Sequence, residues 1–508
     1  HKDFSPALTF GAGIGMPDFD HTGCILLWGF NPATSWLAQA SAVQRARQRG
    51  AKLIVIDPRR AGLAASADLW LQTRPGTDGA LALGLAHLLI ESENFDAAFL
   101  AHWSNAPFLL RLDTGTLLNA ADLEPGANPE QRLVWNLDSR QAEACSPAPS
   151  GNPASPPPTL ALKGRYLLDT PQGRIPCEPV FESLRRRCAE WPPSRVEAIT
   201  GVPETALRQA AQMLAEHLPA SFFTWTGTCQ HDNATRTTRA INVLYALTGC
   251  LDAPGGNVWF DKPPVADIAA FDRVTPEVRR QTIGLAERPL GPASRGWVTS
   301  RDLFRAIVSG SPGPITCFLS FGSNFLHSKP DTQFADEALK KLDFFALTEL
   351  YETPVARYAD LLLPVCTAWE REGLQAGFQV GQTAQAHLQL RPALVPPRGE
   401  SWPDTRIIFE LAHRLGLADE FFGGDPESGL RAQLAPTGLT PETLRDQNAH
   451  PHGITLPLVV RYRKYQQQGF ATPSRRVELY SEILYKHGED PLPGFSAPPA
   501  CTETFDLI

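Results

Sequence analysis

The sequence has 508 residues, of which 43% are hydrophobic and 20% charged, and its formal net charge is −8. These proportions exclude a mainly disordered chain, and the length predicts roughly two to four domains. No apolar run reaches about 18 residues, so we expect no transmembrane helix. The negative charge argues against nucleic acid as the main ligand, although a local positive pocket can bind an anionic cofactor.

The nine cysteines are scattered and form no C-x-x-C pair. This spacing excludes a zinc ribbon, an iron–sulfur ligand run and a thioredoxin-like motif. We expect buried, small apolar cysteines and no disulfide framework. The chain begins with His1 and shows no signal-peptide pattern. We therefore expect a processed or truncated start, with the cytoplasm as the default compartment.

Strands and helices alternate over the first hundred residues. Apolar runs predict buried strands at 24–29 and 51–57, with a helix at 35–49 between them. A short strand at 69–72 and a helix at 79–92 follow. This alternation is typical of an α/β domain with a parallel sheet.

Residues 105–195 interrupt this alternation. Segment 145–159 is rich in Pro, Ser and Gly and predicts an exposed loop. Segment 160–176 predicts two strands joined by a turn at Pro171-Gln172-Gly173. We expect an insertion at the edge of the first α/β domain.

Regular alternation returns at Arg195 and predicts a second α/β domain. Two helices are expected within 195–217, with Thr200 as a cap between them. The further expected elements are strands at 220–227, 317–321, 344–348, 359–366 and 476–480, and helices at 233–248 and 404–415. The predicted fold class is α/β, with two doubly wound, mostly parallel-sheet domains of Rossmann-like type and a loop-rich β insertion. The predicted domains are 1–220, 221–420 and an irregular C-terminal extension at 421–508.

Loops after the predicted strands are the candidate binding sites, because parallel α/β sheets bind ligands at the carboxyl ends of their strands. In the loop Trp28–Ser35, Gly29 allows close approach, and the hydroxyls of Thr34 and Ser35 suit a phosphate. Asp57 can accept hydrogen bonds from a ribose, and Arg59 or Arg60 can contact a phosphate or a base. An ordinary turn, with Asp57 capping its own loop, explains both patterns equally well.

The later loops carry the same kind of ambiguity. Asp78 in RPGTD can accept from the guanine edge, but a helix N-cap is the simpler role for this residue alone. Gln230, His231 and Asn233 crowd one turn, and such polar groups are costly to bury without a partner. The charges of WEREG at 369–373 fit a solvated surface equally well.

Taken in order, these loops resemble the molybdopterin oxidoreductase family, the dimethyl-sulfoxide-reductase-type enzymes that bind two molybdopterin guanine dinucleotides. The likeness covers about residues 20–480. It is carried by WGFNPATS, GAKLIVIDPR, ADLWLQTRPGTD, TGTCQHDNATRTTRAINVLYALTG, DAPGGN, FGSN and ADLLLPVCTAWEREG.

The resemblance implies roles for individual residues. Those implied for the first dinucleotide are Trp28, Gly29, Phe30, Asn31, Pro32, Thr34 and Ser35 at the pyrophosphate and ribose; Asp57, Pro58 and Arg59 at the nucleoside; Gly76, Thr77 and Asp78 at the guanine; and Thr226, Gly227 and Gln230 beside the pterin. Those implied for the second are Asn324, Thr348, Glu349, Arg371 and Asp404. Family members often have Ser-Asp where this chain has Thr348-Glu349, and Glu is one methylene longer. Gln230 and His231 are the implied catalytic residues, near molybdenum or tungsten.

Two parts of such enzymes have no match in the sequence. No cysteine has the spacing of the N-terminal [4Fe–4S] domain, and residues 1–20 offer no clear protein ligand to the metal. Asp18 and Asp20 are most simply turn residues. TPSRRVELYSE, followed by DPLPGF, resembles the lead-in to a C-terminal β-barrel. We therefore expect the two central α/β domains of a larger or split enzyme, which would need the missing domain to hold an iron–sulfur cluster.

The implied function is a molybdenum or tungsten oxidoreductase that transfers oxo, sulfur or hydride groups to or from a small substrate. An electron-transfer subunit with iron–sulfur clusters is the implied partner. A first alternative is a non-catalytic scaffold within an electron-transfer complex, favoured by the missing metal ligand. A second is an NAD-dependent dehydrogenase, but GAGIG at 11–15 precedes the first strand and lacks the G-x-G-x-x-G spacing.

Overall fold

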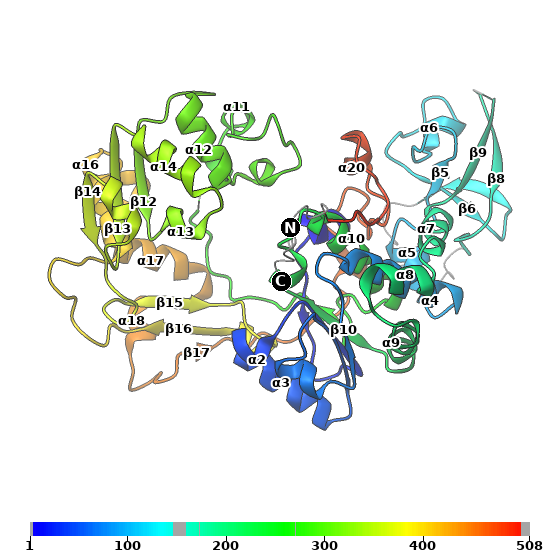
Figure 1. Cartoon of the computed structure of the whole chain (residues 1–508), viewed down its shortest axis with the longest axis horizontal. Helices are drawn as coiled ribbons and strands as arrows, with labels where there is room; N and C mark the ends of the chain where they lie inside the picture. Colours follow the sequence, from blue (N-terminus) through cyan, green and yellow to red (C-terminus); the bar gives the residue numbers. More distant parts are fainter. Residues whose placement is uncertain (1–3, 146–158, 172, 270, 499–508) are drawn as a thin grey trace. The chain divides into compact units, whose positions relative to one another are not determined.

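The computed structural model describes residues 4–145, 159–171, 173–269 and 271–498 (Figure 1). The chain divides into two compact units. Unit 1 comprises His1–Asp261, Gln379–Gln382 and Val459–Ile508, and unit 2 comprises Lys262–Phe378 and Thr383–Leu458. This division differs from the predicted ranges 1–220, 221–420 and 421–508.

Unit 1 is built on a four-stranded parallel sheet of order β10-β2-β3-β4. Its strands are β2 (Cys24–Trp28), β3 (Lys52–Ile56), β4 (Leu69–Leu71) and β10 (Ala220–Thr224). Cys24 is paired with Lys52 on one side and with Ala220 on the other. The strand order therefore reverses at β2, with β3 and β4 on one side of it and β10 on the other.

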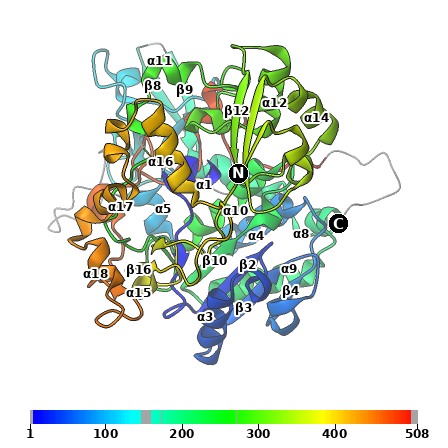
Figure 2. The same ribbon diagram turned by 90° about the vertical axis from the view of Figure 1, so that its left-hand side faces the viewer.

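Both faces of this sheet are buried, which explains why its strands are continuous apolar runs. Leu26 and Phe222 belong to the core cluster that includes α4 (Asp78–Glu91), α9 (Glu204–Glu216) and α10 (Ala234–Thr248). Ile25 and Leu53 face the opposite way and pack with α3 (Leu37–Gln48). Figure 2 shows α3 and α4 on either side of β2 and β3.

A β-rich insertion follows α4, as the sequence predicts. One antiparallel sheet has the order β5-β9-β8 and another pairs β6 with β7. The bounds are β5 (Leu109–Arg111), β6 (Leu133–Asn136), β7 (Gln141–Ala144), β8 (Tyr166–Thr170), β9 (Gly173–Pro179), α5 (Ala97–Trp103), α6 (Ala120–Leu123), α7 (Val180–Ala189) and α8 (Pro193–Thr200). Most of the predicted loop at 145–159, and Gln172 of the predicted turn, lie outside the described residues.

Unit 2 contains a parallel three-stranded sheet of order β12-β13-β14. Its strands are β12 (Cys317–Phe321), β13 (Phe344–Glu349) and β14 (Leu361–Pro364), and one core cluster joins it to α12 (Ser300–Ser309), α13 (Phe325–Ser328) and α14 (Thr332–Lys340). An antiparallel sheet joins β15 (Gly373–Ala376), β16 (His387–Arg391) and β17 (Ile454–Thr455). The helices α16 (Asp404–Arg414), α17 (Pro426–Leu434) and α18 (Pro441–Arg445) also belong to this unit.

The remaining elements are short. They are α1 (Phe4–Phe10), β1 (Met16–Pro17), α2 (Pro32–Ser35), β11 (Asn257–Val258), α11 (Pro276–Arg280), α15 (Gln382–Gln385), α19 (Tyr465–Gln468) and α20 (Glu482–Lys486). Across the described part of the chain, no helix combines the length and apolar character needed to cross a bilayer.

The structure confirms a mixed α/β fold with parallel sheets, but four expectations need correction. β10, expected in the second domain, joins the first sheet because its five buried residues pair with β2. Thr200 ends α8 and does not cap α9, since its hydroxyl donates to Val196 O and Gly201 is the left-handed C-cap. Segment 476–480 is not a strand, because only Val477 forms a bridge, with Ser104. In unit 2 the strand order does not reverse.

Candidate functional site

Two glycine loops meet where the strand order of unit 1 reverses. The Gly227 amide donates to Gly29 O at 3.1 Å. A Cβ added to Gly227 would lie 2.7 Å from Gly29 Cα, and Gly29 itself has a φ of +55°. Both positions therefore require glycine. This crevice, at the carboxyl ends of β2 and β10, is where open α/β sheets bind ligands.

The loop after β2 leaves one buried polar atom without a partner. Asn31 Nδ2 donates to Thr34 Oγ1, and Ser35 Oγ donates to Asn31 O. Asn31 Oδ1 is buried and has no hydrogen bond. Phe30 packs on Phe223, with 4.9 Å between the ring centroids. The Thr34 and Ser35 hydroxyls thus order the short helix α2, and Asn31 offers the available acceptor.

Trp28 and Asp78, both predicted at the cofactor, bind each other. Trp28 is fully buried, and its Nε1 donates to Asp78 Oδ1 at 2.7 Å. Burial raises the pKa of the Asp78 carboxyl, while the indole hydrogen bond and the charge of His231 lower it. Asp78 is the first residue of α4. The N-cap of this helix is Thr77, whose side chain makes no capping hydrogen bond. The N-cap interpretation of Asp78 is therefore wrong.

A cavity of about 450 Å³ lies at the carboxyl ends of β3 and β4. Its lining residues are Pro58, Arg59, Gln72, Thr73, Arg74, Pro75, Thr200 and Gly201. Asp57 Oδ1 accepts from the Arg59 amide at 2.8 Å, so this carboxylate caps its own turn. Arg74 is held by Ala198 O and Ile199 O, whereas Arg60 lies over the Trp70 ring. The volume is within the range of small-molecule sites.

The loop after β10 places His231 against the loop after β4. A Cβ on Gly76 would lie 3.6 Å from His231 Nδ1, and Asn233 Nδ2 donates to Gly76 O at 2.8 Å. His231 is half-buried, while Thr226, Gly227 and Gln230 are exposed. Trp28, Gly76, Asp78 and His231 therefore lie together, at or shortly after the carboxyl ends of three strands of one sheet.

In unit 2, three of the five predicted residues carry buried polar atoms without a partner. They are Asn324 Oδ1, Thr348 Oγ1 and Arg371 Nε. Thr348 is fully buried in β13, and Asn324 precedes α13. Glu349 Oε2 accepts from the Leu350 amide, and Asp404 is the first residue of α16. Such orphaned atoms cost free energy unless a ligand or water supplies the missing bond.

Sequence reasoning missed two hydroxyls of the same kind. Thr224 Oγ1, at the end of β10, and Thr353 Oγ1, shortly after β13, are buried and unpartnered. Thr224 could have been found from the sequence, because it is the polar residue at the end of an apolar strand. Glu370 has a different role, because its carboxylate accepts from Thr367 N, Thr367 Oγ1 and Arg398 N and so orders its own loop.

Asp18 has a structural role in unit 1. Asp18 Oδ2 accepts from Gly255 N and from Tyr462, and it binds His21 Nδ1. Asp18 therefore joins segments distant in sequence and does more than complete a turn. None of the eight described cysteines forms a disulfide, and Cys501 lies outside the described residues. Cys317 is exposed and Cys229 is half-buried, so the expectation that the cysteines are buried is wrong for these two. Within the described ranges, no group of three or more His, Cys, Asp or Glu side chains could hold a metal ion.

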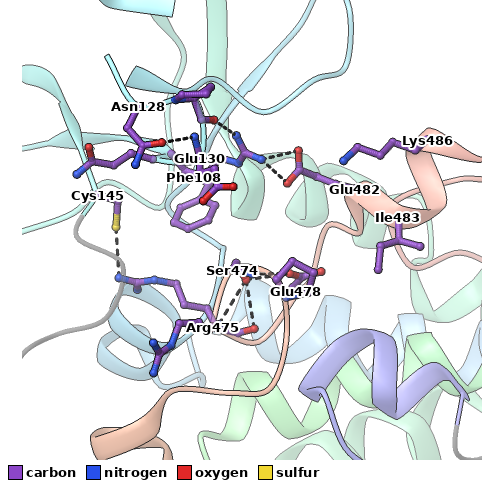
Figure 3. A pocket seen from close by; sticks show the side chains of 15 residues that line it. Phe108, Asn128, Glu130, Cys145, Ser474, Arg475, Glu478, Glu482, Ile483 and Lys486 are labelled. Atoms are coloured by element: carbon purple, nitrogen blue, oxygen red, sulfur yellow. Dashed lines mark hydrogen bonds and ion pairs between the residues drawn. The ribbon is translucent and has the colours of Figure 1, made fainter. Parts of the chain in front are cut away.

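A second cavity, of about 500 Å³, lies in unit 1 between the insertion and the segment 473–486 (Figure 3). Arg132 binds both carboxylate oxygens of Glu482, and Ser474 Oγ donates to Glu478. Arg476 donates to Cys145 Sγ. None of its lining residues has an orphaned buried atom among the described side chains. We therefore assign no ligand to this cavity.

The fold and these strand-end loops define a class of proteins. Residues 3–414 match the family model described as Molybdopterin oxidoreductase. Since this match spans well over half of the chain, the protein belongs to the molybdopterin oxidoreductase family. The resemblance predicted from the sequence is confirmed.

Individual relatives carry enzyme names. The chain is 26% identical to acetylene hydratase of Syntrophotalea acetylenica, over 94% of this chain and 58% of the relative. It is 30% identical to the dimethylsulfide dehydrogenase subunit alpha of Rhodovulum sulfidophilum, over 76% of this chain and 45% of the relative. The chain therefore spans about half the length of these curated relatives.

A solved structure shares the fold. Acetylene hydratase from Pelobacter acetylenicus superposes with a TM-score of 0.72 at 24% identity. The match covers 98% of this chain and 61% of that chain. Both units of this chain thus have the fold of a longer family member.

Proposed function

We propose that the protein is a molybdenum or tungsten oxidoreductase that holds molybdopterin guanine dinucleotide at the carboxyl ends of its parallel strands. Family membership supports the proposal. The observation that carries it is the set of buried, unpartnered polar atoms at the predicted cofactor residues, namely Asn31 Oδ1, Asn324 Oδ1, Thr348 Oγ1 and Arg371 Nε.

The chemistry of these atoms fits the cofactor. Amide and hydroxyl groups can form hydrogen bonds with ribose and base, and a guanidinium can bind phosphate. In unit 1, Asn31 and the backbone of Gly29 and Gly227 would hold the first dinucleotide, with its nucleoside in the cavity beside Arg59. In unit 2, Asn324, Thr348 and Arg371 would hold the second. Glu349 and Asp404 remain proposed contacts of the second dinucleotide.

The bound cofactor would supply a metal that exchanges two electrons with a small substrate. The chain would orient the substrate and provide the electrostatic environment. His231 would hold or move a proton at its imidazole, with the Asp78 carboxyl as a neighbouring charge. Gln230 is exposed in the same loop and would offer an amide. An electron-transfer partner is proposed because a relative is named as an alpha subunit.

The two alternatives are less well supported. GAGIG has a packing role, since a Cβ on Gly11 would lie 2.2 Å from Ala471 C and one on Gly15 would lie 2.8 Å from Val258 C. These glycines therefore give no support to an NAD site. A scaffold protein would gain stability by replacing buried orphaned atoms with apolar ones, and this chain retains them.

The test compares two fully buried threonines. Thr348 Oγ1 has no partner, whereas Thr238 Oγ1 donates to Ala234 O at 2.8 Å. We expect Thr348→Val to stabilise the cofactor-free protein by about 1 kcal/mol and to lower its molybdenum or tungsten content. Thr238→Val should destabilise it by a similar amount and leave metal per folded chain unchanged. Denaturant unfolding and elemental analysis provide both measurements.

Two results would oppose the proposal. Equal destabilisation by the two valine variants would mean that the Thr348 hydroxyl already has a partner in the protein. The wild-type chain is analysed first, after expression in cells that synthesise the cofactor. If the purified protein contains neither molybdenum nor tungsten, this chain does not bind the cofactor.

A further inference from the structure

The Asn233 side chain ties three segments of unit 1 together. Its Nδ2 donates to Gly76 O at 2.8 Å and to Ser496 O at 2.6 Å. Gly76 belongs to the loop after β4, Ser496 lies near the C-terminal end of the described chain, and Asn233 itself precedes α10. The two N–H groups of one amide are thus both used to join distant segments.

This use of the side chain is not a helix cap. Asn233 stands at the N-cap position of α10, yet its side chain makes no cap hydrogen bond. It is only 5% exposed. An asparagine at this position ordinarily accepts from the first turn of its own helix. Here the amide donors point to the other two segments, so the residue connects loops at a buried point.

The His231 imidazole lies against this connection. Gly76 has a φ of +80°, and a Cβ there would lie 3.2 Å from Pro498 Cγ and 3.6 Å from His231 Nδ1. The Ala234 amide donates to His231 O at 3.0 Å. The imidazole, Gly76 and Pro498 are therefore packed together, with the Asp78 carboxyl close enough to feel the charge of His231.

The segment 490–498 is anchored independently before it reaches this point. Arg187 Nη1 binds Asp490 Oδ2 at 2.7 Å, and Arg239 Nη2 donates to Pro491 O at 2.9 Å. The Phe495 ring contacts Trp191, with 5.4 Å between centroids. α7 and α10 hold the start of this segment, and Asn233 forms a hydrogen bond to its far end, at Ser496 O.

We infer that Asn233 is a positioning residue, which holds His231 between the loop after β4 and the segment 495–498, beside Asp78. The inference rests on the proposed function for the role of His231 in the reaction. The geometry of the link is independent of the cofactor, so it can be tested without turnover.

The test is Asn233→Ala in the purified full chain, with Asn233→Asp as a second variant of the same shape. The probe is diethyl pyrocarbonate, and the rate of carbethoxylation at His231 is followed by peptide mass spectrometry. We expect about tenfold faster modification in both variants, because two hydrogen bonds that order the loop are lost.

Asn105→Ala is the matched control. Asn105 is also buried, and its Nδ2 donates to Tyr480 O of the same C-terminal region at 2.8 Å. This variant should lose stability but keep the His231 modification rate within about twofold of the wild type. An unchanged His231 rate in Asn233→Ala, or equal changes in both alanine variants, overturns the inference. The proposed function fails separately, if the wild-type chain binds neither metal.

Discussion

At the scale of single residues, the contact between the Trp28 indole and the Asp78 carboxyl has a testable energetic consequence. The folded-state pKa of Asp78 is raised by burial, so this residue lowers the stability of the protein as pH rises. The indole hydrogen bond opposes that rise. We expect Trp28→Phe to cost about 2 kcal/mol, with a larger cost at pH 8 than at pH 5, because the ionised carboxyl loses more. Denaturant unfolding at both pH values measures it.

Trp70 provides the control for this prediction. Trp70 Nε1 donates to Asp57 O at 2.9 Å, and a backbone carbonyl does not titrate. Trp70→Phe should therefore cost the same at pH 5 and pH 8. If the stability costs of Trp28→Phe and Trp70→Phe vary with pH in the same way, the indole does not stabilise the ionised Asp78 carboxyl.

Sequence reasoning at this scale found residue types but could not tell which atoms already had partners. Asn31, Asn324, Thr348 and Arg371 were predicted and carry orphaned buried atoms. Asp57 was predicted in the same way, yet it caps its own loop. The difference depends on where neighbouring backbone amides point, which local sequence does not specify.

At the scale of elements, the contact between the two glycine loops constrains the site. A Cβ on Gly227 would meet the backbone of Gly29 at 2.7 Å, and backbone cannot move aside as a side-chain end can. We expect Gly227→Ala to destabilise unit 1 by about 3 kcal/mol and to lower metal content. Unfolding and elemental analysis measure both effects.

Gly313 is the matched control for Gly227. No heavy atom lies within 4 Å of a Cβ built there. Gly313→Ala should change stability by less than about 0.5 kcal/mol. A Gly227→Ala protein as stable as the Gly313→Ala protein would show that the two loops do not require their close contact.

The hydrophobic periodicity of the sequence predicts most of the strands and helices. It fails where the pairing partner of a segment determines its structure. The apolar run of β10 predicts a buried strand, but it does not indicate that this strand pairs with β2. Segment 476–480 has an alternating pattern, yet its backbone binds Asn105 Oδ1 through the Leu479 amide instead of a strand. Long-range pairing of this kind is not encoded in a short window.

At the scale of the whole molecule, the buried carboxyl of Glu478 makes the stability of unit 1 depend on pH. Burial raises the pKa of Glu478 to about 7, while bonds from Ser474 and the charge of Arg239 oppose the shift. Since the folded-state pKa exceeds the ordinary value of 4.5, the protonated carboxyl favours the folded state. This stabilisation is complete below about pH 4.5 and is lost as pH rises to about 7, for a total of about 3 kcal/mol.

Glu478→Gln should remove this dependence. Between pH 5 and pH 8, we expect the unfolding free energy of this variant to vary by about 2.5 kcal/mol less than that of the wild type. Glu130→Gln is the control, because Glu130 is exposed on the wall of the same cavity and its replacement should keep the wild-type slope. Denaturant unfolding at one-unit pH steps gives the comparison, and a Glu478→Gln protein with the wild-type slope would contradict it.

The division of the chain also sets an order of events during synthesis on the ribosome. Unit 2 is made from residues 262–458 alone, apart from the short stretch 379–382, whereas unit 1 needs residues on both sides of it. β2 gains its β10 neighbour only after about 190 further residues have been translated. Until then the edge of β2 is open to other strands. The nascent chain should therefore need protection from aggregation mainly in its first 220 residues, and unit 2 should acquire protease resistance before unit 1.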